Sequence, residues 1–141
     1  MEIFTDGLRF KQIAVGAHHN LLLSEEGDLY GFGARMNGQI DGINYDGREE
    51  QCSILPISFP ESVGKAKIKS IDARSLKSQM TTVDGQVWFW GGYFYDGRSL
   101  KSKDLKQLID GFNLLNEEAG IPKDATILSY GMGFAHDTVL L

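Results

Sequence analysis

The sequence is poor in the residues from which disulfides, metal sites and cofactor sites are usually built. Its 141 residues include one cysteine, three prolines and three histidines. Because Cys52 is the single cysteine, an internal disulfide and a cysteine-rich zinc module are both excluded. His18 and His19 are adjacent, but no spacing joins them to further ligands in a tetrahedral set. We therefore expect no metal and no cofactor.

The chain also lacks a long hydrophobic run and an excess of positive charge. No apolar stretch approaches the roughly 18 residues that a membrane helix needs. Met1–Asp6 has no basic region ahead of an apolar one, as a secretion signal would. The formal net charge of −5 argues against nonspecific binding to nucleic acid or to an anionic membrane. We therefore expect a soluble, intracellular protein that binds neither nucleic acid nor membrane directly.

Sequence motifs typical of enzymes are missing as well. Gly31, Gly33 and Gly38 do not form a dinucleotide-binding fingerprint, because the third glycine is too distant and no helix is expected to follow. The chain has no Gly-x-Ser-x-Gly motif. Pairs of carboxylates lie in turn or linker contexts, where a solvated surface is the simpler interpretation: Glu25-Glu26, Glu49-Glu50 and Glu117-Glu118. We therefore expect no catalytic residues and no enzyme.

Glycine, by contrast, is abundant, with 17 residues against the roughly ten that an average usage of about 7% would give. The glycines separate short apolar runs, which is typical of strands in an all-β domain. Ser24–Asp28 and Thr82–Gln86 each place an acidic residue before a glycine between β-formers, so both are predicted hairpin turns. Val87–Trp90 has no polar alternation, so both faces of this strand should be covered by neighbouring sheets.

The chain contains an internal repeat. A shift of 58 residues places Phe10–Gly33 on Ile68–Gly91 without a gap, and both turn glycines coincide. A further shift of 59 residues brings the C-terminal segment onto the first half of the unit. The repeats are expected at about 10–67 and about 68–126, with the start of a third at about 127–141, which amounts to about 2.4 units.

Ile13–Gly33 and its continuation Asn37-Gly38-Gln39-Ile40 resemble the repeat of the regulator-of-chromosome-condensation family. That repeat runs Ile-Ala-x-Gly-x-x-His, an apolar strand, a glycine turn, an aromatic-glycine pair and then Gly-Gln-Leu-Gly. The second copy is degenerate, because Arg74 replaces the first glycine and Lys77 replaces the histidine. The resemblance implies an incomplete β-propeller of antiparallel four-stranded blades, with two blades and the start of a third. Propellers of this family commonly have seven blades.

The repeat pattern suggests structural roles for its glycines and histidines. Gly16 and Gly133 should let neighbouring backbones approach closely. His19 and His136 should form hydrogen bonds with backbone groups of a neighbouring turn. We favour this structural role over ligand binding, because buried polar groups need partners.

The segment between the second and third copies departs from the repeat. Five apolar residues recur at helical spacing and predict a short helix near 103–118: Leu105, Leu108, Ile109, Phe112 and Leu115. Gly111 lies inside this run and disfavours a helix by about 1 kcal/mol relative to alanine. The competing interpretation is the fourth strand of a blade around Phe112–Leu115.

A tetrapeptide occurs twice, as Tyr45-Asp46-Gly47-Arg48 and as Tyr95-Asp96-Gly97-Arg98. Equivalent loops of adjacent propeller blades emerge on the same face, so Tyr45, Arg48, Tyr95 and Arg98 form a candidate partner-binding surface. Tyrosine and arginine are favoured anchors in protein interfaces. The simpler alternative is that Asp-Gly makes a turn twice, with incidental flanking residues.

The family resemblance does not fix the function. Its members include exchange factors for small GTPases, ubiquitin-ligase modules and a tryptophan-based photoreceptor, and the last fits poorly because Trp88 and Trp90 are the only tryptophans. Our leading hypothesis is a non-catalytic protein-interaction or structural subunit that docks within a larger assembly. Its partners would be other subunits or the remainder of a longer propeller. The alternative is a fragment of a guanine-nucleotide exchange factor for a Ran-like small GTPase.

Overall fold

The structure is a computed structural model that describes residues 7–42, 50–61, 63–65, 67–91, 113–114, 121–122, 125, 127–132 and 137–140. The described residues form antiparallel strands arranged in three sheets. Blade 1 contains, in sheet order, β1 (Phe10–Val15), β2 (His19–Ser24), β3 (Leu29–Ala34) and β4 (Glu50–Pro56). Blade 2 contains β5 (Ile68–Arg74), β6 (Lys77–Thr82), β7 (Val87–Gly91) and β8 (Asn113–Leu114). The third sheet pairs β9 (Ser129–Met132) with β10 (Asp137–Leu140).

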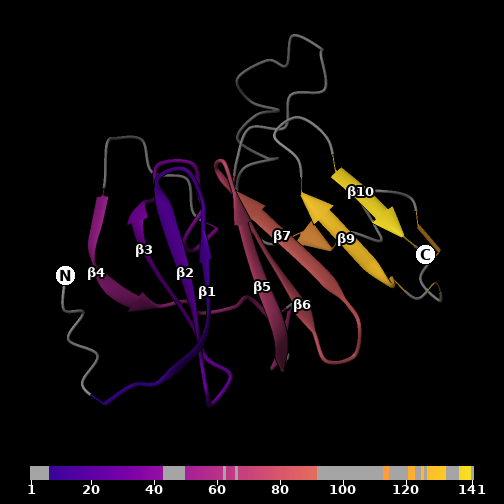
Figure 1. Cartoon of the computed structure of the whole chain (residues 1–141), viewed down its shortest axis with the longest axis horizontal. Coiled ribbons are helices and arrows are strands. Elements are labelled where there is room, and N and C mark those ends of the chain that lie inside the picture. The colour runs from indigo at the N-terminus through magenta and orange to yellow at the C-terminus, as the bar shows by residue number, and fades with distance from the viewer. Residues whose placement is uncertain are drawn as a thin grey trace, which may run out of the picture.

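These sheets are two blades and the start of a third blade of a β-propeller, which confirms the predicted fold class. Figure 1 shows them side by side, with blade 1 at the left, blade 2 in the centre and the β9–β10 sheet at the right. Each blade places its strands in chain order, because every connection within it joins adjacent antiparallel strands. No helix among the described residues is long and apolar enough to span a membrane.

Both predicted hairpin turns are present and use the same chemistry. Gly27 and Gly85 have φ angles of +97° and +87°, which a side chain would disfavour. The residue before each turn uses its hydroxyl as a cap: Ser24 Oγ accepts from the backbone N–H of Asp28 at 3.0 Å, and Thr82 Oγ1 accepts from that of Gln86 at 3.0 Å. The turns therefore fix the register of β2 with β3 and of β6 with β7.

The non-alternating strand β7 is buried along its whole length, as its sequence predicts. Trp88 and Trp90 belong to the main core, which lies between the two blades and includes Leu21 and Met80. Val87 and Phe89 face the other way and form a second cluster with two partly buried residues of the connection to β9, Ile121 and Ile127. Because both faces of β7 are covered, neither face meets solvent, and the strand has no alternating polar residues.

The helix expected near 103–118 is wrong at Asn113–Leu114, which form strand β8. There Leu114 pairs with Trp88 and Asn113 pairs with Phe89. The open edge of β7 needs a partner for its backbone N–H and C=O groups, and this requirement outweighs the helical spacing at these two residues. The competing interpretation of a fourth strand is confirmed there, while the rest of the segment lies outside the described residues.

Candidate functional site

The interface between the two blades begins with a side chain that binds the neighbouring backbone at two points. The side-chain amide of Gln12 on β1 donates to the carbonyl oxygen of Ile71 at 2.7 Å. Its Oε1 accepts from the N–H of the same residue at 3.0 Å. One glutamine thus satisfies both backbone groups of a β5 residue, as another strand would. A direct backbone bond lies beside it, from the N–H of Ala17 to the carbonyl of Ser75 at 2.8 Å.

The repeat histidine, His19, lies fully buried in the same interface. Its Nε2 lies 2.8 Å from Oγ of Ser78, and this hydroxyl donates to the backbone carbonyl of Gln39 at 2.5 Å. A serine hydroxyl has one proton, so Nε2 must carry the proton that joins the ring to Ser78. The expected contact with the neighbouring repeat is therefore present, but it reaches a backbone group through a hydroxyl.

Burial keeps His19 neutral. Loss of hydration lowers the pKa of the imidazole from 6.5 to about 4, while the backbone of Lys77 acts in the opposite direction and the nearby His18 lowers the pKa further. Nδ1 has no hydrogen-bond partner within the described part of the chain. A neutral ring with its proton on Nε2 matches a structural bridge between blades.

Gly16 is a glycine because the His19 ring folds over it. A Cβ at Gly16 would lie 2.2 Å from Cε1 of His19 and 2.9 Å from the carbonyl oxygen of Ser75. In the degenerate second copy the glycine and the histidine are replaced together, by Arg74 and Lys77. Without the imidazole, the space that excludes a side chain is no longer occupied.

The loop after β3 completes the interface. Arg35 and Asp41 form a 2.7 Å ion pair across this 35–42 loop, and the N–H of Asn37 donates to Oε1 of the buried Gln39 at 2.7 Å. The loop then meets blade 2, where Trp90 Nε1 donates to the carbonyl of Ile40 at 3.1 Å. The Gly-Gln segment of the repeat therefore provides backbone acceptors to the next blade.

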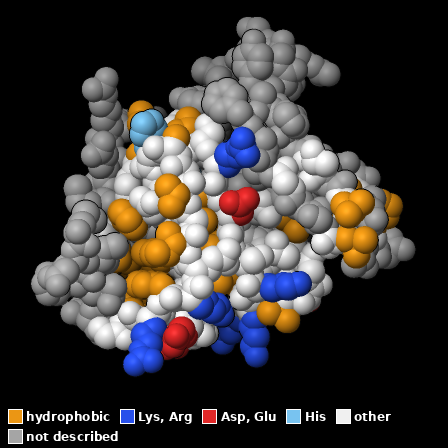
Figure 2. Space-filling view, in the orientation of Figure 1, with side chains coloured by type: hydrophobic (Ala, Val, Ile, Leu, Met, Phe, Trp, Pro, Cys, Tyr) orange, Lys and Arg blue, Asp and Glu red, His pale blue; other side chains and the backbone are white. Residues whose placement is uncertain are grey.

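The face of β1 that points away from blade 2 is exposed. Side chains alternate along a strand, so Gln12 and Ala14 face blade 2 while Ile13 and Val15 face the opposite side. Ile13 is 61% exposed and Val15 is 65% exposed. We call the surface formed by these two residues the open face of blade 1. Figure 2 shows hydrophobic side chains gathered over the part of the molecule that blade 1 occupies.

The four residues proposed from the sequence as a partner-binding surface lie outside the described residues: Tyr45, Arg48, Tyr95 and Arg98. Their grouping stays a prediction. His136 and Gly133 of the third copy also lie outside the described residues. Within the described part of the chain, no group of three or more His, Cys, Asp or Glu side chains is placed to hold a metal ion.

Two interface residues were not anticipated from the sequence. Gln12 has Ser70 as its counterpart in the second copy, so alignment of the repeats carries no sign of its role. Gln39 lies in the Gly-Gln part of the family pattern, and this match could have marked it as a structural residue of the repeat. Its role depends on the chain fold around it, because its backbone carbonyl rather than its side chain contacts Ser78.

Comparison with known proteins identifies the repeat. The profile of the regulator of chromosome condensation (RCC1) repeat matches residues 10–39. The chain is 30% identical over 86 residues to a mitochondrial RCC1 domain-containing protein, RUG3, of Arabidopsis thaliana, covering 61% of this chain and 18% of the relative. It is 34% identical over 87 residues to Protein RCC1 of Candida albicans, covering 57% and 18%.

A solved structure shows the same fold. Yeast RCC1 (Prp20), in its complex with Kap60, superposes with a TM-score of 0.63 at 22% identity, over 92% of this chain and 29% of the yeast chain. The chain thus spans less than a third of the length of the relatives that it matches.

Proposed function

The chain belongs to the regulator of chromosome condensation repeat family, and from that premise we propose that it is a non-catalytic interaction or structural segment of a propeller. It acts by docking its blades against further sheets in a larger assembly. Its partners are proteins, either other subunits or further blades of the same kind. The names of some relatives include ligase activities, but this chain covers 2% of one such relative and 13% of another.

The open face of blade 1 is the observation that carries this proposal. The repeat alignment places Ile13 on Ile71 and Val15 on Ala73. Ile71 is 4% exposed and Ala73 is 7% exposed, because blade 1 covers them. The same positions in blade 1 are more than half exposed. A neighbouring sheet covers these positions in blade 2, whereas no sheet of the described residues covers them in blade 1.

Association through this face can be measured by light scattering over a concentration series. We expect the mass of the wild-type chain to rise with concentration, because burial of Ile13 and Val15 removes apolar surface from water. The double variant Ile13→Ser/Val15→Ser should stay closer to the monomer mass. Val83→Ser is the matched control, because Val83 is equally exposed, at 65%, on a turn of blade 2. Equal masses for wild type and double variant would contradict the proposal.

The second candidate is a part of a guanine-nucleotide exchange factor for a Ran-like small GTPase. The 34% identity to Protein RCC1 of Candida albicans favours it. The test is release of labelled GDP from a Ran-like GTPase by the full-length protein that carries this chain. Accelerated release would support exchange activity, whereas release at the uncatalysed rate would leave the interaction role.

A further inference from the structure

A groove lies between the blades at the end where the strands β1 and β5 begin. Its volume is about 770 Å³, and both blades contribute to it. The floor is apolar, with the buried side chains of Leu29, Ile57 and Ile68. Phe59 lies partly buried against this floor. The groove is separate from the open face, because it follows the turns at the strand ends rather than the surface of β1.

One aromatic wall of the groove is held in place by packing. Tyr30 stands edge-on to Phe10, with ring centroids 5.6 Å apart and an angle of 81° between the planes. Ile57 is fixed by its N–H, which donates to the carbonyl of Leu29 at 2.8 Å. Val83 is fixed in the same way by the carbonyl of Lys67, also at 2.8 Å. The walls and floor are therefore largely preformed, which reduces the entropy lost on binding.

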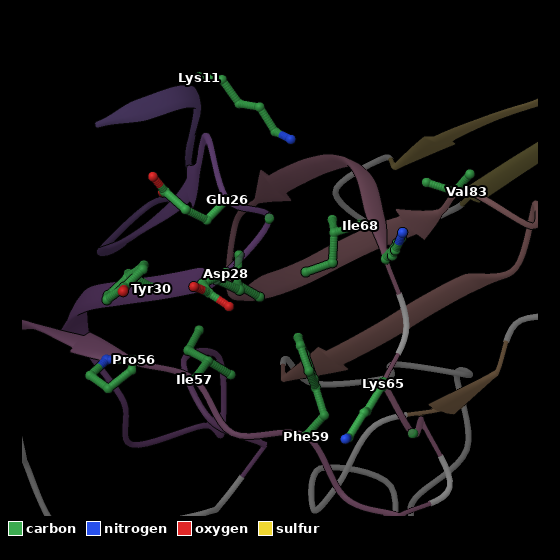
Figure 3. Close-up of a pocket in the computed structure, with 14 residues that line it drawn as sticks. Lys11, Glu26, Asp28, Tyr30, Pro56, Ile57, Phe59, Lys65, Ile68 and Val83 are labelled. Carbon is green, nitrogen blue, oxygen red and sulfur yellow. The ribbon is translucent and has the colours of Figure 1, made fainter. Parts of the chain in front are cut away.

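The groove carries charges of both signs, and Figure 3 shows Lys11 on the same side as Glu26. Lys11, Lys65 and Lys67 line it with exposed ammonium groups. No ion pair joins these lysines to a carboxylate in the part of the chain that the structure describes. Glu26 and Asp28 also line the groove, and Figure 3 shows both on the blade 1 side, with the carboxylate of Glu26 directed away from the floor.

Lys65 and Lys67 lie on the segment that leads into β5, whose first residue, Ile68, belongs to the apolar floor. Figure 3 shows Phe59 and Ile68 between Lys65 and the blade 1 residues that line the groove. The chain as a whole has a net charge of −5, so a segment with two exposed lysines beside an apolar floor is locally opposite in sign to the chain. Such a reversal beside an apolar floor selects a ligand that is both acidic and apolar.

We propose that this groove binds an acidic peptide segment of a partner protein. An apolar side chain of the peptide rests on the floor of Leu29, Ile57 and Ile68, and its carboxylates face Lys65 and Lys67. The volume falls within the range of about 300–1,000 Å³ that is typical of ligand sites. An inorganic anion would leave the apolar floor unused, and a purely apolar peptide would leave the lysines unused. The site adds a second surface to the docking role and does not depend on it.

The test uses the full 141-residue chain and a fluorescein-labelled, end-blocked peptide of sequence EDFDE, followed by fluorescence anisotropy. Three comparison peptides separate the contributions: KKFKK reverses the charge, EDSDE removes the aromatic ring, and KKSKK removes both features. We expect saturable binding of EDFDE, at least about tenfold weaker binding of EDSDE and no saturable binding of the two basic peptides. Binding of EDFDE should also weaken as salt is raised, because the lysines are exposed.

A matched pair of variants locates the site. Lys65→Glu/Lys67→Glu should weaken EDFDE binding by at least about tenfold. Lys69→Glu/Arg74→Glu makes the same change in net charge at exposed positions of β5 outside the groove, and should leave the affinity within about threefold. The near-ultraviolet circular dichroism of Trp88 and Trp90 confirms that each variant is folded. Equal weakening by both variants, or absence of saturable binding to the wild type, would overturn the proposal.

Discussion

Gly91→Ala is expected to lower the free energy of unfolding by about 3–5 kcal/mol, the largest effect of any single change considered for this chain. Gly91 ends β7 with a φ angle of +72°, in the left-handed region that side chains disfavour. A Cβ there would also lie 2.5 Å from Cα of Gln39, which is a backbone atom of the neighbouring blade. Backbone atoms cannot rotate away, so the 35–42 loop would have to move.

Gly85→Ala separates the two causes. Gly85 lies in the turn that precedes β7, with a φ angle of +87°, and nothing lies within 4 Å of a Cβ built there. Gly85→Ala should therefore lower the free energy of unfolding only by the cost of holding an alanine at positive φ, about 1–2 kcal/mol. Urea unfolding followed by tryptophan fluorescence measures both variants against the wild type. Equal losses at the two positions would show that the contact between Gly91 and Gln39 does not constrain the interface.

The second large effect is a loss of stability in mild acid that originates in His19. The pKa of this imidazole is about 4 in the folded chain and 6.5 as an unperturbed side chain. The unfolded chain therefore binds a proton between these two values while the folded chain does not. The contribution of neutral His19 to the free energy of unfolding is fully present above pH 6.5. It falls as the pH drops toward 4, by about 3 kcal/mol at 1.36 kcal/mol per pKa unit.

His19→Gln provides the comparison, because glutamine keeps a donor for Ser78 but does not titrate. The quantity to measure is the free energy of unfolding at intervals from pH 7 to pH 4 for both proteins. Carboxylates titrate in the same way in each, so their contribution cancels in the difference. We expect the wild type to lose about 3 kcal/mol more than the variant over this range. Parallel pH profiles would rule out His19 as the buried neutral group.

The agreement between sequence and structure is closest where the cause is local. The turns at Gly27 and Gly85 depend on a few residues each, with a hydroxyl cap and a glycine at positive φ. The covered strand Val87–Trp90 is read directly from its lack of alternation. The correction at Asn113–Leu114 has a non-local cause, because the helical spacing around it competes with the unpaired edge of a strand more than twenty residues earlier.

The blade interface shows the same division at the level of single side chains. The repeat pattern predicted structural roles for Gly16 and for His19, but it could not show that the His19 ring covers Gly16 or that Ser78 is the bridging group. It also gave no sign that Gln12 would bind both backbone groups of Ile71. These partners are 59 residues apart, so their contact depends on the distance and angle between blades, which no local pattern encodes.

The sequence by itself determined the all-β class, the repeat and the two hairpin turns, because these follow from periodicity and turn chemistry within short windows. It also showed the resemblance to a family of propeller repeats, through the motif around Ile13–Gly33. Tertiary structure alone decided which surfaces remain available. Ile13 and Ile71 are the same residue at the same repeat position, yet one is exposed and the other buried. Burial depends on whether a neighbouring sheet covers the strand, and that is a property of position in the stack rather than of residue type.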